Sequence, residues 1–165
     1  NEISWFDWTL VDKHAGLRRF CSALIDFRRS EPTVRQVNFL HGEPTRPGGL
    51  PDVSWFGASG GQVEWGGDSR SLVCLLGALP PQEPEALPNH HVMILAHAGT
   101  DARHFVIPVV ARGLGWRLFV DTAAESPADI YPNLDGPPAP DNGVVTMEAR
   151  SIVVYVAADV QPRRL

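Results

Sequence analysis

The sequence predicts a mainly β protein, an antiparallel β-sandwich of about eight strands in Greek-key order that one α-helix precedes. The first observation is that helical periodicity is confined to the first 30 residues. The second is that apolar residues thereafter alternate or fall in short runs, as in strands. The third is that 15 glycines and 15 prolines punctuate the 165 residues. Short strands separated by such turns favour an antiparallel sandwich or barrel.

The helix is expected over Asp12–Ser30, with Asp12 as its N-cap. Arg28 and Arg29 suit the negative C-terminal end of the helix dipole. Pro32 ends the helix, because the residue before a proline avoids the α conformation. Three- and four-residue spacings form one apolar stripe, which consists of Leu17, Phe20, Cys21, Leu24 and Phe27.

Nine runs after the helix are candidate strands, and glycine-rich turns separate them. They are Gln36–Leu40, Val53–Phe56, Gln62–Trp65, Ser71–Leu76, His91–His97, His104–Val110, Trp116–Asp121, Val144–Met147 and Ile152–Ala157. The stretch Glu125–Pro140 is rich in proline, alanine and aspartate. We therefore expect it to be a long surface loop.

Composition argues against several classes of function. The formal net charge is −5, and no basic cluster is interleaved with aromatics, so nucleic-acid binding is not expected. No apolar run approaches the roughly 18 residues that span a bilayer. Cys21 and Cys74 are expected to be small buried apolar side chains in a reducing compartment.

No metal or other cofactor is expected. His97 and His104 flank a tight connection between two predicted strands, but a zinc site needs three or four ligands. The adjacent His90 and His91 would point to opposite faces of a strand. Ser, His and Asp all occur, but the sequence shows no recognisable context for a hydrolytic triad.

Five motifs, taken together and in this order, resemble one family. They are NEISWFDW with its F-x-x-x-L-I-x-x-R-R helix, DVSWFGASGGQVEW, HVMILAHAGTDARHFVIP, GWRLFVDTA and EARSIVVYVA. They resemble the C-terminal end of bacterial glycogen debranching enzymes of the isoamylase type, in the α-amylase superfamily of glycoside hydrolases. The resemblance runs from Asn1 to Ala157. Ala96 departs from it, because the family usually has Asn there.

The resemblance implies a parent enzyme of the bacterial cytoplasm that hydrolyses α-1,6 branch linkages in glycogen or limit dextrin. Residues 1–32 would be the end of its catalytic (β/α)8 barrel, a loop and the last helix. Residues 33–165 would be its C-terminal β-sandwich domain. The motifs that carry the family's catalytic carboxylates lie upstream and are not in this sequence, so this chain alone is expected to be inactive. Its expected role is to stabilise the barrel.

Tryptophans are candidates for sugar contact, because sugar rings stack on aromatic faces. By the resemblance, Asn1, Glu2 and Trp5 would lie at the rim of the parent's active site and bind substrate. Trp55 and Trp65 flank a glycine pair and are expected to form a cross-strand aromatic pair, in the core or in an interface. Another aromatic residue, Trp116, is expected in the core.

The expected partners are the catalytic barrel of the same parent chain and, through the parent, α-glucan such as glycogen or maltooligosaccharide. The sequence has no initiator Met and is expected to be a piece of a longer protein. In the isolated chain, the apolar helix stripe is expected to favour a dimer. Two other functions stay open: a stand-alone α-glucan-binding module and an immunoglobulin-like interaction domain.

Overall fold

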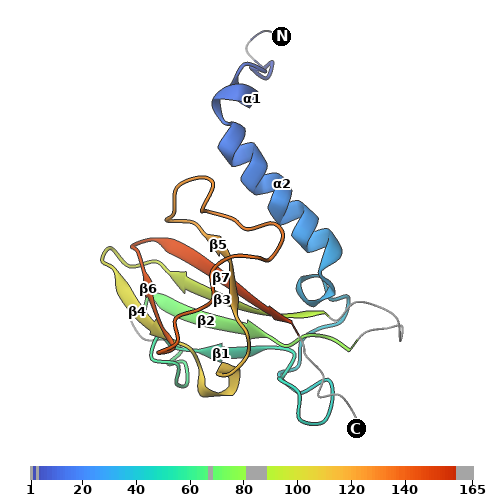
Figure 1. Ribbon diagram of the computed structural model, residues 1–165, viewed down its shortest axis with the longest axis vertical. Coiled ribbons are helices and arrows are strands. Elements are labelled where there is room, and N and C mark those ends of the chain that lie inside the picture. The colour runs from blue at the N-terminus through green and yellow to red at the C-terminus, as the bar shows by residue number, and fades with distance from the viewer. Residues whose placement is uncertain (1, 3, 67–68, 81–88, 159–165) are drawn as a thin grey trace.

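The chain folds into antiparallel β-structure with a helical N-terminal part (Figure 1). The computed structural model describes residues 2, 4–66, 69–80 and 89–158. The helical elements are α1 (Leu10–Lys13), α2 (Ala15–Ser30) and the 3-10 turns η1 (Pro32–Val34) and η2 (Val109–Ala111). The strands are β1 (Ser54–Phe56), β2 (Ser71–Leu76), β3 (His90–His97), β4 (Arg103–Val106), β5 (Arg117–Asp121), β6 (Val144–Met147) and β7 (Ser151–Ala158). The mainly β class is confirmed.

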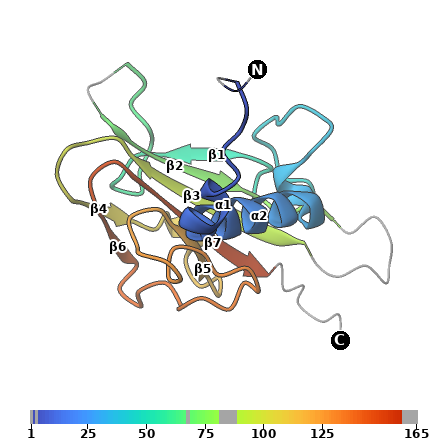
Figure 2. The same ribbon diagram turned by 90° about the horizontal axis from the view of Figure 1, so that it is seen from above.

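Five strands form the larger sheet, in the order β1-β2-β3-β7-β5 with antiparallel neighbours. Its centre is the pair β3–β7, which is in register from His90 opposite Ala158 to His97 opposite Ser151. A second, two-stranded sheet consists of β4 and β6. Figures 1 and 2 both show this small sheet at the end of the molecule away from the C-terminal end of α2. No helix among the described residues is long and apolar enough to span a bilayer.

The two faces of the five-stranded sheet contribute to two apolar clusters, because successive side chains of a strand point to opposite faces. One cluster joins sheet residues such as Val73 and Leu95 to Phe105 of β4 and Met147 of β6. The other joins Val92 and Val156 to Phe20, Ala23 and Phe27 of α2. The sheet is thus covered by β4–β6 on one face and by α2 on the other.

The helix differs from its predicted start. α1 begins at Leu10, and the chain departs from helical geometry at His14 (φ −111°, ψ 33°) before α2 begins. The predicted N-cap role of Asp12 is wrong, because Asp12 lies inside α1. The predicted end is right: α2 stops at Ser30, and the Glu31 N–H donates to the Phe27 carbonyl oxygen.

Two predicted strands, Gln36–Leu40 and Gln62–Trp65, are wrong. In the first, Val37 and Phe39 are 99% and 90% exposed, so its alternating apolar side chains are not buried against another element. The second makes an isolated bridge, from Gln62 to Phe56, where a glycine turn brings the chain back beside β1. The predicted His104–Val110 run is shortened, because Pro108 precedes η2.

The predicted surface loop Glu125–Pro140 is irregular, but parts of it are buried. Ile130 is 2% exposed and belongs to the cluster under α2. The loop also hydrogen-bonds along β5. Its carbonyl oxygens at Asp129 and Pro137 accept from Asp121 and Leu118, and its N–H groups at Tyr131 and Ala139 donate to Phe119 and Trp116. It therefore covers one edge of the sheet.

Candidate functional site

The candidate substrate-binding residues of the sequence lie in the segment before α1. Glu2 is exposed, Trp5 is 72% exposed, and Asn1 lies outside the described residues. Nearby, Phe6 and Trp8 make an edge-to-face contact with ring centroids 5.1 Å apart. Asp7 accepts hydrogen bonds from the Thr9 hydroxyl at 2.7 Å and the Thr9 N–H at 3.0 Å. These bonds lower the pKa of Asp7 and hold the turn into α1.

α2 presents two adjoining apolar sides, of which one is packed. Phe20, Ala23 and Phe27 face the sheet, and the Phe27 ring lies 4.2 Å from the Phe119 ring, centroid to centroid. At about 100° per residue, the positions 17, 21, 24 and 25 fall on the next side of the helix. That side is exposed, and it consists of Leu17, Cys21, Leu24 and Ile25. The predicted single stripe is therefore divided, and Cys21 is not the buried residue that was predicted.

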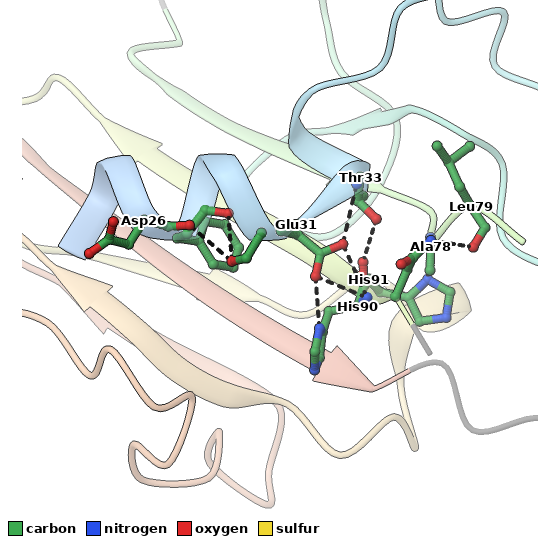
Figure 3. Close-up of polar contacts among 10 residues, drawn as sticks. Asp26, Glu31, Thr33, Ala78, Leu79, His90 and His91 are labelled. Carbon is green, nitrogen blue, oxygen red and sulfur yellow. Dashed lines mark hydrogen bonds and ion pairs between the residues drawn. The ribbon is translucent and has the colours of Figure 1, made fainter. Parts of the chain in front are cut away.

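A polar junction joins the end of α2 to the start of β3 (Figure 3). The carboxylate of Glu31, 4% exposed, accepts from the Thr33 N–H at 3.2 Å, from the His90 N–H at 3.3 Å and from His90 Nδ1 at 2.8 Å. The Thr33 hydroxyl donates to the His90 carbonyl oxygen at 2.8 Å. We call Glu31, Thr33 and His90 the helix–strand junction. It fixes the C-terminal end of α2 against the first residue of β3.

The charge of Glu31 is maintained despite burial. Burial raises the pKa of Glu31, but the hydrogen bonds from His90 and Thr33 outweigh it, and the net effect is a lowered pKa. The adjacent His91 is directed elsewhere: its Nδ1 accepts from the Ala78 N–H at 2.8 Å. The prediction that His90 and His91 point to opposite sides is confirmed.

Asp52 organises the turn that follows residue 40. Its buried carboxylate accepts backbone N–H bonds from His41, Gly42 and Val53, each at 2.7–2.8 Å. Burial raises the pKa of Asp52, but these three bonds lower it more. The contacts are all main-chain donors, so we assign Asp52 a role in loop structure.

The structure does not bring His97 and His104 together as a metal site. His97 is buried: its Nδ1 lies 2.9 Å from the Ser71 hydroxyl and its Nε2 lies 2.7 Å from the Asp101 carbonyl oxygen. A ring that donates from Nε2 accepts the Ser71 proton at Nδ1. His104 instead lies 3.0 Å from the Thr146 hydroxyl. Among the described residues, no group of three or more His, Cys, Asp or Glu side chains is placed to hold a metal ion.

The tryptophans divide into buried and exposed. Trp116 is 3% exposed and its indole N–H donates to the Ala111 carbonyl oxygen at 2.7 Å, which confirms the predicted core position. Trp55 and Trp65 make the predicted ring contact. They are nevertheless 43% and 69% exposed, so within this chain they do not belong to the core. Sequence reasoning could find the pair but not its exposure, which depends on what lies over β1.

Comparison with known proteins agrees with the motifs. No protein-family model matches the chain. It is 29% identical over 131 residues to the "glycogen operon protein GlgX homolog" of Mycobacterium tuberculosis and of Mycobacterium bovis, over 74% of this chain and 18% of theirs. It is 25% identical over 162 residues to an isoamylase of a Flavobacterium species, over 93% of this chain and 20% of that protein. The chain is homologous to GlgX and to isoamylase. The resemblance to glycogen debranching proteins is thereby confirmed, and the chain spans about a fifth of the length of these relatives.

Proposed function

We propose that the chain is the C-terminal accessory region of a glycogen debranching enzyme that hydrolyses α-1,6 glucosidic branch linkages in glycogen or limit dextrin. The chain itself would stabilise the catalytic barrel of this glycoside hydrolase and would not hydrolyse the linkage alone. The order of the motifs and the printed names of the relatives support this family assignment. The five-stranded sheet and the β4–β6 ladder are compatible with the β-sandwich of the parent, and the bacterial cytoplasm is its expected location.

The observation that carries the structural role is the exposed side of α2. Leu17, Leu24 and Ile25 are 62%, 36% and 57% exposed, next to a side of the same helix that is packed on the sheet. Aliphatic side chains in a row on a helix are stabilised when another surface covers them. We propose that the occupant is the barrel of the parent chain, because the matched region covers only 18–20% of the relatives. Asn1, Glu2 and Trp5, which precede α1 in the sequence, would then bind substrate at the barrel rim.

The test compares Leu17→Glu in this chain and in the longer enzyme. In the monomeric form of this chain the charge would meet water, so at a concentration where the chain is monomeric we expect an unchanged unfolding midpoint. In the enzyme it would be buried without a partner, so we expect a lower midpoint and lower activity on limit dextrin. Ser22→Glu is the matched control, since it is exposed and lies about 140° around α2 from Leu17. Equal effects of the two variants in the enzyme would refute the barrel contact.

A second copy of the chain is the other candidate for this surface in isolation. The exposed side of α2 favours pairing when no barrel is present. Sedimentation velocity at low and high concentration would show a dimer that Leu17→Glu abolishes. A wild-type chain that stays monomeric at both concentrations would exclude this pairing.

A further inference from the structure

Trp55 and Trp65 are two large aromatic side chains that touch each other and are both exposed. Their ring centroids are 6.1 Å apart and their planes meet at 70°, so they form an angled pair. Trp55 belongs to β1, at the edge of the five-stranded sheet. Exposed clusters of this kind in a soluble protein mark sites that contact a ligand or a partner. We refer to these two residues as the aromatic pair.

The turn between the two tryptophans is tightly anchored. The Gly57 N–H donates to the Gly61 carbonyl oxygen at 3.0 Å, and the Gly60 N–H donates to Gly57 at 2.9 Å. Gly60 has φ +74°, and a Cβ there would lie 2.7 Å from the Val106 carbonyl oxygen. The Val106 N–H donates to the carbonyl oxygen of buried Ala58 at 2.8 Å. The turn is therefore held against β4, which preorganises the pair and lowers the entropic cost of binding.

The surroundings of the aromatic pair fit a sugar better than a protein. The residues beside it in the chain are mostly small or polar, and Ser59, Gln62 and Glu64 are exposed. Protein interfaces are enriched in tryptophan but depleted in serine and glutamate, so the polar neighbours rather than the rings favour a sugar. A pyranose presents C–H groups on its faces and hydroxyls at its edges, so it needs a ring to stack on and polar groups around that ring. The exposed side of α2, by contrast, is aliphatic.

An apolar hollow begins close to Trp55 on the same face of the sheet. Trp55 is paired with Cys74, and Leu72, two residues from Cys74 on β2, points to the same side. Leu72, Ala96 and Ile152 are paired across β2, β3 and β7 and form the floor of a hollow of about 540 Å³. Its rim includes the exposed polar residues Ser69, Arg70 and Arg150. An apolar floor with a polar rim extends the surface that the aromatic pair begins.

We propose that the aromatic pair and this hollow bind a linear segment of α-1,4-glucan. The sugar would stack on the indoles and donate or accept hydrogen bonds at the polar rim. The nature of the sugar rests on the proposed function, because a glycogen-debranching enzyme meets α-1,4-linked chains. The existence of a carbohydrate site rests on the aromatic pair and the adjoining hollow, independently of that function.

Titration of the 165-residue chain with maltoheptaose tests the proposal, with the indole N–H resonances of the five tryptophans as the readout. We expect saturable shifts at Trp55 and Trp65. Trp65→Ala should weaken binding at least about tenfold, roughly the loss of one stacked ring. Trp65→Phe keeps a ring and should lose less. Phe39→Ala is the matched control, because Phe39 is also an exposed aromatic residue, and it should bind like the wild type.

The absence of shifts at the solubility limit of the sugar would overturn the proposal. So would shifts confined to Trp5 and Trp8, or equal affinity of Trp65→Ala and the wild type in chains whose spectra show the same fold. These outcomes would leave the debranching assignment intact, since hydrolysis of limit dextrin by the longer enzyme tests it separately. If the longer enzyme did not hydrolyse limit dextrin while this chain bound maltoheptaose as expected, only the proposed function would be contradicted.

Discussion

The helix–strand junction gives a sharp prediction for the variant Glu31→Gln. Its amide oxygen can still accept one hydrogen bond, but the amide nitrogen faces donors at the Thr33 and His90 main chain and at the His90 ring. A hydrogen bond to a charged group contributes about 1.5–3 kcal/mol. The His90 side chain is 29% exposed, and water can replace that partner. We therefore expect a loss of about 2 kcal/mol at neutral pH, or a midpoint lowered by about 4–8 °C.

The pH dependence tests the reasoning behind that magnitude. The pKa of Glu31 is lowered in the folded chain from its usual 4.5. A carboxyl group with a lowered folded pKa stabilises the fold above the unfolded pKa and ceases to do so as the pH falls through the folded pKa. The difference in unfolding free energy between wild type and Glu31→Gln should thus be complete at pH 6–7 and shrink below about pH 4.5.

Urea unfolding followed by far-UV circular dichroism at pH 7 and at several values below 5 is the assay. Glu148→Gln, at an exposed carboxylate, is the control and should leave the midpoint unchanged at each pH. An equally stable Glu31→Gln at pH 7, or a deficit that does not change with pH, would refute the role assigned to the charged carboxylate.

Two further predictions concern packing. Gly136→Ala should destabilise the chain by about 1–3 kcal/mol in thermal unfolding, because its Cβ would overlap the Leu118 carbonyl oxygen, whereas Gly115→Ala, with open space around it, should be tolerated. If both variants unfolded at the wild-type midpoint, the close approach of the loop to β5 would be wrong. Cys74 should react with iodoacetamide at pH 8 more slowly than exposed Cys21, because burial raises the pKa of Cys74 to about 11. Equal rates, read by mass spectrometry of the peptides, would contradict this.

The strands that were predictable from sequence are those whose pattern is enforced by burial. Ser71–Leu76 and Val144–Met147 have the predicted bounds, because their alternating side chains face the apolar cluster on the β4–β6 side. Gln36–Leu40 has a similar local pattern but no neighbouring strand to pair with, and its apolar residues are exposed. Local periodicity does not report the presence of a partner, so this error could not be avoided from the sequence.

The candidate sites were predictable to different degrees. The contact between Trp55 and Trp65 followed from the glycine pair between them, but their exposure did not. The helix–strand junction was missed, because the pattern marks Glu31 only as the end of the helix and leaves His90 just outside the predicted strand His91–His97. Their contact spans 59 positions in the sequence. The available signal was an acidic residue directly after a helix and before a proline.

The loop that lies along β5 has a consequence for self-association. An unpaired strand edge is a template on which another chain can add a strand and start an aggregate. Here the outer edge of β5 already exchanges hydrogen bonds with the 125–140 segment. The five prolines of that segment have no N–H that could donate to a strand of another chain. On the opposite side, β1 is only three residues long. One edge of the sheet is thus covered by a proline-rich segment, and the other edge is a three-residue strand. Neither edge is a favourable template for amyloid-like strand addition.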